Sequence, residues 1–121
     1  MDNKITLTES DLIYFTWTEN YYRHPLIRKV CYTDGIKYVA DVGNARWLID
    51  EIAIHQMKKS IAGEGFQVWT LKVNGDKIAV LTCDDGNENT IYREGINYTT
   101  FPLEEIKIYC IDNVILLPSE Y

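Results

Sequence analysis

His24 stands among several groups that are able to recognise a ligand. It directly follows two aromatic residues and a guanidinium, Tyr21, Tyr22 and Arg23. Pro25 favours extended backbone at His24, so we expect this segment to be an exposed loop. Aromatic rings, donors and an imidazole in one loop could hold a phosphate or a base, or could form the hot spot of a protein interface. The two tyrosines could equally anchor the loop on the core, so the residue types alone leave their role open.

His55 is the second candidate for acid–base chemistry. It lies four residues after Glu51, a spacing at which a helix brings an imidazole and a carboxylate into contact. An ion pair on the helix surface accounts for the same spacing, and no nucleophile is near in the sequence. A small hydrolase or nucleotide-binding protein would therefore need Asp50, Asp84 or Asp85 to converge with a histidine in the folded chain.

Common catalytic and metal-binding motifs are absent from the sequence. No serine has the glycine neighbours of a nucleophile elbow, and no glycine-rich run ends in the Gly-Lys-Ser/Thr of a phosphate loop. The segment 85–96 begins like a calcium loop, but it lacks glycine at the sixth position and glutamate at the twelfth. Three widely separated cysteines, Cys31, Cys83 and Cys110, favour reduced and mostly buried thiols over a disulfide framework or a zinc site. The preferred interpretation has no catalytic residue, cofactor or metal.

Charge is unevenly distributed along the chain. Twelve basic and eighteen acidic residues give a net charge of −6, although residues 21–59 are locally basic. The acidic total opposes phosphate binding, so we expect a protein partner rather than direct binding to nucleic acid. The acidic residues of the C-terminal half, among them Asp84, Asp85 and Glu88, could imitate nucleic acid toward a basic protein, although ordinary solubility explains them more simply.

Length and composition predict one domain that spans residues 1–121. With 46% hydrophobic and 12% aromatic residues, the chain can build a core. No apolar run approaches the roughly 20 residues of a membrane span, and the N-terminus does not resemble a signal peptide. We therefore expect a cytoplasmic protein with no membrane partner.

The N-terminal third predicts a short helix and a hairpin. Thr8 and Asp11 form a capping-box pattern, which predicts a helix over about 9–16. Between Arg28 and Gly43, alternating apolar residues flank an Asp34-Gly35 pair, which predicts two strands joined by a tight turn.

Residues 45–61 predict one long helix with two apolar stripes. The stripe that should lie on the sheet comprises Ala45, Leu48, Ile49, Ile52 and Ala53. The second comprises Trp47, Ile54, Met57 and Ile61, with Asp50 inside it. Such a helix either is sandwiched within the fold or offers its second stripe to a partner or to a second copy of the chain, as in a homodimer.

The remainder of the chain has the pattern of antiparallel strands. These are expected at 66–73, 78–83, 90–98, 106–111 and 114–117, with turns at Asn74-Gly75 and Asp112-Asn113. The order predicts an α+β fold in which a curled antiparallel sheet of about six strands has one long helix packed across it.

Several segments between residue 15 and the end carry a recognisable signature. They are Phe15-Thr16-Trp17-Thr18-Glu19, Tyr22-Arg23-His24-Pro25-Leu26, Tyr32-Thr33-Asp34-Gly35, Trp47-Leu48-Ile49-Asp50, Leu81-Thr82-Cys83-Asp84-Asp85-Gly86-Asn87, Phe101-Pro102-Leu103 and Leu117-Pro118-Ser119-Glu120-Tyr121. Together they resemble an uncharacterised family of small bacterial and mobile-element proteins, catalogued as a domain of unknown function. The resemblance implies no activity. It does imply that Arg23 and His24 recur together with Asp50, and either basic residue could satisfy such a carboxylate if it is buried.

We expect a small acidic protein-interaction module, with an anti-defence inhibitor of a nuclease or ribonucleoprotein effector as one form of it. The mobile-element association rests on the resemblance alone. The expected contact residues are Tyr21, Tyr22, Arg23, His24, Trp47, Asp50, Ile54 and Met57, and the expected acidic surface is Asp84, Asp85 and Glu88. The alternative is the small hydrolase or nucleotide-binding protein that uses a histidine–aspartate cluster.

Overall fold

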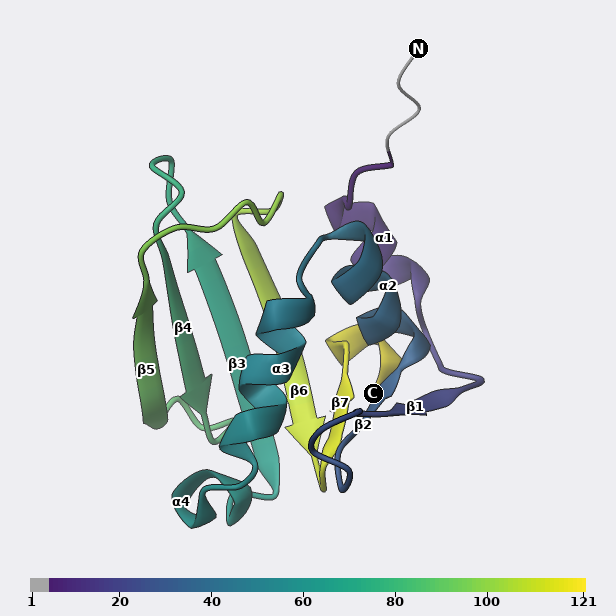
Figure 1. Cartoon of the computed structure of the whole chain (residues 1–121), viewed down its shortest axis with the longest axis vertical. Coiled ribbons are helices and arrows are strands. Elements are labelled where there is room, and N and C mark those ends of the chain that lie inside the picture. Colours follow the sequence, from purple (N-terminus) through teal and green to yellow (C-terminus); the bar gives the residue numbers. More distant parts are fainter. Residues whose placement is uncertain (1–4) are drawn as a thin grey trace.

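The computed structural model describes residues 5–121. It consists of a seven-stranded mixed sheet with helices packed against it (Figure 1). The strands are β1 (Tyr21–Arg23), β2 (Cys31–Thr33), β3 (Phe66–Val73), β4 (Ala79–Asp84), β5 (Thr90–Ile96), β6 (Glu105–Ile111) and β7 (Val114–Leu116). The helices are α1 (Glu9–Tyr14), α2 (Asp34–Val42), α3 (Arg46–His55) and α4 (Lys59–Ala62), followed near the C-terminus by the short 3-10 helix η1 (Pro118–Glu120). The predicted α+β class is confirmed, whereas the strand count and the single long helix are wrong.

The strands after residue 65 lie close to their predicted positions. β3 is central and pairs antiparallel with β4 and β6, and β5 and β7 extend the sheet on either side. Asp112 and Asn113 both adopt positive φ, at 49° and 67°, as a tight hairpin turn between β6 and β7 requires. The turn between β3 and β4, predicted at Asn74-Gly75, is of a different kind. Its positive-φ residue is Lys77, and the Asn74 side chain accepts hydrogen bonds from the backbone N–H groups of Asp76 and Ile78.

The N-terminal part adds two short strands, of which β2 coincides with the first strand of the predicted hairpin and β1 was not predicted. β2 pairs in parallel with β7, and β1 pairs antiparallel with β2 at the edge of the sheet, giving the order β1-β2-β7-β6-β3-β4-β5. The segment 21–23, predicted to be loop, is therefore an edge strand. The sheet is mixed because β2 meets a strand that lies about 80 residues later in the chain.

The predicted hairpin between Arg28 and Gly43 is wrong, because the residues after Thr33 form helix α2. The Thr33 hydroxyl accepts a hydrogen bond from Ile36 N at 3.4 Å, as an N-cap does. The buried residues of this segment, Ile36, Val39 and Ala40, have helical spacing. The apolar residues of the same segment also alternate with polar ones, which is the pattern of a strand. Local pattern could not decide between helix and strand here, and the N-terminal cap favours the helix.

The predicted long helix is divided into α3 and α4. Its first stripe is buried as expected, but α3 ends at His55, and the side chain of Gln56, the next residue, hydrogen-bonds Gln67 in the core. Ile61, assigned to the second stripe, is only 2% exposed, since α4 has left the axis of α3.

Helices α2 and α3 cover one face of the sheet (Figure 1). The core lies between them and the sheet, where Trp69, Leu71, Leu81 and Ile108 point toward the helices and are at most 1% exposed. The predicted N-terminal helix is confirmed as α1, with the complete Thr8–Asp11 capping box. None of the helices between residues 5 and 121 has the length and apolar character needed to cross a membrane.

Candidate functional site

His24 is buried rather than exposed, and both of its ring nitrogens have partners. Nε2 lies 2.7 Å from a carboxylate oxygen of Asp50 on α3. Nδ1 accepts hydrogen bonds from the backbone N–H groups of Leu26 and Ile27, at 3.2 Å and 3.0 Å. Because a backbone N–H can only donate, Nδ1 carries no proton in this arrangement and Nε2–H donates to Asp50. The expectation that His24 sits on an exposed loop is therefore wrong: it is 2% exposed and fastens the loop to α3.

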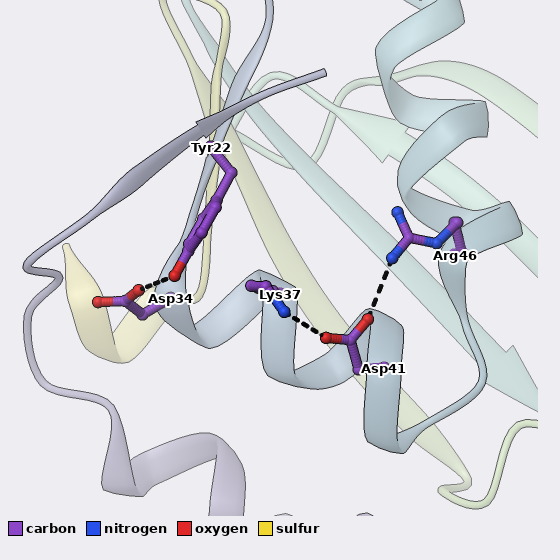
Figure 2. A network of polar contacts seen from close by, with 5 residues as sticks. All are labelled: Tyr22, Asp34, Lys37, Asp41 and Arg46. Atoms are coloured by element: carbon purple, nitrogen blue, oxygen red, sulfur yellow. Dashed lines mark hydrogen bonds and ion pairs between the residues drawn. The ribbon is translucent and has the colours of Figure 1, made fainter. Parts of the chain in front are cut away.

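Tyr22 belongs to a second group of hydrogen bonds, which is centred on Asp34 at the start of α2 (Figure 2). The Tyr22 hydroxyl donates to Asp34 at 2.9 Å, and the backbone N–H groups of Glu19 and Asn20 donate to the same carboxylate. Burial alone would raise the pKa of Asp34, but these donors and the Asn20 side chain lower it to about 2. The segment that leads into β1 is thus tied to α2.

The same helix carries an ion-pair chain that joins α2 to α3. Asp41 accepts from Lys37 at 2.6 Å and from Arg46 at 3.1 Å (Figure 2). The hydrogen bond and the charge of Asp41 raise the pKa of Lys37, whose ammonium also lies 5.7 Å from the centre of the Tyr22 ring.

The chain from the last turn of α1 to the first residue of β1 presents large apolar side chains to solvent. We call this set the exposed aromatic segment; it consists of Ile13, Tyr14, Trp17 and Tyr21, which are 63–79% exposed. α1 itself has no buried residue. A hollow of about 620 Å³ is lined by part of this segment and by the Asp34 carboxylate that holds it. Sequence analysis selected Tyr21 but missed Tyr14 and Trp17, since nothing in an apolar pattern distinguishes exposed rings from core.

β1 has an open edge beside the exposed aromatic segment. His24 N–H donates to Val30 C=O at 2.8 Å, and antiparallel bonding alternates, so the N–H and C=O groups of Tyr21 and Arg23 point away from β2. β1 is the edge strand, so within residues 5–121 no second strand pairs with these groups. The Arg23 guanidinium donates to the backbone carbonyl of Arg28 and so also shapes the loop.

The second apolar stripe of α3 is partly covered by other parts of the chain. Trp47 is half-buried beside Ile96, and Asp50 is bound to His24. Ile54 and Met57 are 47% and 64% exposed, so they form a small apolar patch at the C-terminal end of α3.

A polar cluster lies between α3 and β5, and sequence analysis identified only its Glu51–His55 pair, whose Oε1 and Nδ1 atoms are 3.7 Å apart. His55 donates from Nδ1 to the backbone carbonyl of Glu51 at 2.8 Å, and its ring packs 4.2 Å from that of Tyr92. Tyr92 donates to Glu94 at 2.7 Å. Burial, then the adjacent Glu94 carboxylate, raise the pKa of Glu51, while burial and Glu94 raise the pKa of Tyr92 to about 12. The sequence showed the Glu51–His55 spacing, but pairing with Glu94 depends on how α3 crosses the sheet.

The predicted acidic surface lies at the end of β4, with Asp84, and in the loop between β4 and β5. Asp84 accepts from Gly86 N at 2.7 Å, and Asp85 accepts from the backbone of Asn87 and Asn89. The Asn89 amide, followed by these backbone donors, lowers the pKa of Asp85. Glu88 is exposed at a φ of 67°. Two of the three carboxylates therefore build the loop.

Metal binding and thiol chemistry find no support in the described residues. Between residues 5 and 121, no three histidine, cysteine, aspartate or glutamate side chains are placed to hold a metal ion. Cys83 and Cys110 are buried, and burial raises the pKa of each thiol to about 12, so neither is a nucleophile at neutral pH. Cys31 is a half-buried free thiol.

The chain is a small acidic α+β protein in which both histidines are buried and hydrogen-bonded. Of the features described above, the exposed aromatic segment is the one that most resembles a binding surface. A model of a family of unknown function, DUF6876, matches residues 6–121, so the chain belongs to that family, and the resemblance noted in the sequence is confirmed. Comparison with curated proteins and with solved structures gave no significant match.

Proposed function

We propose that this chain is a protein-interaction module that binds its partner through the exposed aromatic segment. The observation that carries the proposal is the exposure of Ile13, Tyr14, Trp17 and Tyr21, all within nine consecutive residues. Soluble proteins rarely leave such a group of large apolar side chains in water unless a partner covers it. Tryptophan and tyrosine are also enriched among residues that dominate binding energy.

The way this segment is held favours binding. Asp34 fixes the backbone at Glu19 and Asn20, and Tyr14 packs edge-on against Phe15 with ring centres 5.4 Å apart. A preorganised surface loses less conformational entropy when it binds. Among the expected contact residues, we therefore assign Tyr21 and Arg23 to the interface, and assign Tyr22 and His24 to holding it.

The partner class that we propose is a nuclease or ribonucleoprotein effector. Its support is the resemblance to mobile-element proteins, together with a surface that needs no net positive charge to bind protein. Acidic mimicry by the β4–β5 loop adds little, because Asp84 and Asp85 already accept hydrogen bonds from that loop.

The alternative, a small hydrolase or nucleotide-binding protein, has weaker support. A general base needs a ring nitrogen that can take up the proton of a reacting group. In His24 one nitrogen accepts two backbone N–H groups and the other faces Asp50. His55 is 4% exposed and packs against Tyr92 and Trp69.

Affinity capture with matched variants tests the interaction module. Tagged wild-type chain, a Trp17→Ala/Tyr21→Ala variant and an Ile54→Ala/Met57→Ala variant are expressed in the native host, and co-purifying proteins are quantified by mass spectrometry. Binding of the purified partner is then measured by calorimetry. We expect one stoichiometric partner that the first variant loses and the second retains. Equal retention by both variants, or no enriched protein, would overturn the proposal.

A further inference from the structure

The sheet has a second face, which α2 and α3 do not cover. Side chains alternate along each strand, so Trp69 and Leu71 of β3 point into the core while Thr70 and Lys72 point to the opposite side. The register places Lys107 of β6 beside Thr70. We call the outward side of β6, β3, β4 and β5 the open face.

Cations lie at both ends of one row across the open face. Pairing joins Lys107 to Thr70, Thr70 to Thr82 and Thr82 to Arg93, so the row crosses four adjacent strands. At roughly 4.8 Å per strand, the two cations are about 14 Å apart along the sheet. Within the described residues, no carboxylate forms a salt bridge with either one.

Two carboxylates also lie on this face, and one of them is paired with a cation. Glu105 lies 3.8 Å from Lys72, its cross-strand neighbour, and Asp84 accepts a hydrogen bond from the backbone of Gly86. The chain as a whole carries a charge of −6. On the open face, however, the cations Lys72, Lys107 and Arg93 outnumber the carboxylates Glu105 and Asp84 by one, and a local excess of positive charge is complementary to phosphate.

Three aromatic rings form a cluster on the same side of the sheet as Lys107. Phe66 and Tyr109 lie on neighbouring strands with ring centres 4.9 Å apart. Tyr121 lies 5.7 Å from Phe66 and 5.8 Å from Tyr109, and it is 76% exposed. Tyr109 and Lys107 are two residues apart on β6, so ring and cation share the open face.

A hollow borders the same face where α1 and η1 meet β6. It has a volume of about 190 Å³, and Lys107 lines it together with the apolar side chains of Leu12, Leu117 and Pro118. An apolar hollow beside a cation suits a ligand that is flat and apolar at one end and anionic at the other.

We propose that the open face binds single-stranded nucleic acid. Bases stack on the cluster of Phe66, Tyr109 and Tyr121, and phosphates contact Lys107 and Arg93. Stacking on aromatic rings tolerates any sequence, because every base has a π-face, and an antiparallel sheet with aromatic rings on its exposed side is a common platform for it. Trp17 and Tyr21 are not among the residues of the open face, although Ile13 of the exposed aromatic segment also lines the hollow beside Lys107.

Fluorescence anisotropy of the purified chain tests this proposal. The probes are labelled oligouridine and oligothymidine of about 15 nucleotides, and a labelled DNA duplex of equal length. We expect both single strands to bind at low salt and the duplex to bind more weakly; preference for oligouridine would identify RNA as the ligand, and equal binding would identify any single strand. The Lys107→Ala variant should reduce the slope of log affinity against log salt by about 0.7.

Matched variants separate stacking on this face from unspecific binding. Tyr121→Ala should weaken binding by about tenfold. Tyr98→Ala removes a ring of similar exposure that lies on the α3 side of the sheet, and Lys59→Ala removes an exposed charge on α4. Both control variants should bind like the wild type. Absence of binding to either single strand, duplex binding of equal strength, or equal losses in the control variants would each overturn the proposal.

Discussion

The side-chain amides of Gln56 and Gln67 exchange two hydrogen bonds inside the core, each 2.8 Å long. Gln56 also donates to Ile52 C=O, Gln67 to Ile61 C=O, and Trp69 Nε1–H donates to the Gln67 oxygen at 2.9 Å. Every polar group of the pair is therefore satisfied, although both residues are at most 2% exposed. The pair joins the end of α3 to β3.

Replacing Gln67 with leucine should destabilise the fold strongly. Gln67→Leu leaves the Gln56 amide oxygen, one of the Gln56 amide hydrogens and the Trp69 N–H without partners in the core, at an expected cost of about 3 kcal/mol. Urea unfolding measures the loss, and Gln56→Leu with the double variant completes a thermodynamic cycle. A coupling of about 1 kcal/mol or more is expected; simple additivity would contradict a cooperative pair.

His24 should prove to be a residue of stability rather than of catalysis. His24→Ala removes the acceptor for Leu26 and Ile27 and the contact with Asp50, which should cost about 2–4 kcal/mol. In His24→Asn, the amide oxygen can still accept the loop N–H groups, so its loss should be smaller. Asp50→Asn keeps an acceptor for Nε2–H and should change stability by less than about 1 kcal/mol. Thermal and urea unfolding rank the three variants, and an unchanged His24→Ala would refute this role.

Asp34 should make stability fall in acid. Its pKa drops from 3.8 to about 2 on folding, so the folded state favours the carboxylate. The contribution is complete above the unfolded pKa and is lost as the pH falls from about 4 to 2. Urea midpoints measured across this range should decline less steeply for Asp34→Asn than for the wild type. Asp76→Asn, the same change in an exposed turn, is the control and should leave the slope as it is.

Gly35 should not tolerate a side chain. A Cβ there would lie 2.6 Å from Glu120 Oε1 and 2.7 Å from Leu117 Cδ1. Helix propensity favours alanine over glycine by about 1 kcal/mol, yet the overpacking should dominate and destabilise Gly35→Ala by about 2 kcal/mol. Gly95→Ala meets no atom within 4 Å and serves as the control for urea unfolding. A more stable Gly35→Ala would show that the C-terminal segment gives way easily.

Local signals predicted the elements whose stabilising contacts lie close in sequence. The Thr8–Asp11 capping box closes within three residues, and β3 was predicted at its observed bounds because the Asn74-Gly75 pair directly follows a strand-like run. The prediction of a strand after Thr33 was wrong for the opposite reason. The helix that forms there is stabilised by Glu120, whose carboxylate accepts from Gly35 N at 3.0 Å across 85 residues.

The same distinction applies to the candidate site. The sequence alone determined that aromatic and basic residues concentrate around residues 21–24, that no common catalytic motif is present, and that α3 has a continuous buried stripe. Only the tertiary structure decided that His24 turns inward to Asp50, that Trp17 is left in water, and that Lys107 and Arg93 share one face. Residue type fixes what a side chain can bond to, but burial and partners depend on contacts between segments far apart in the chain, and those contacts exist only once the sheet has assembled.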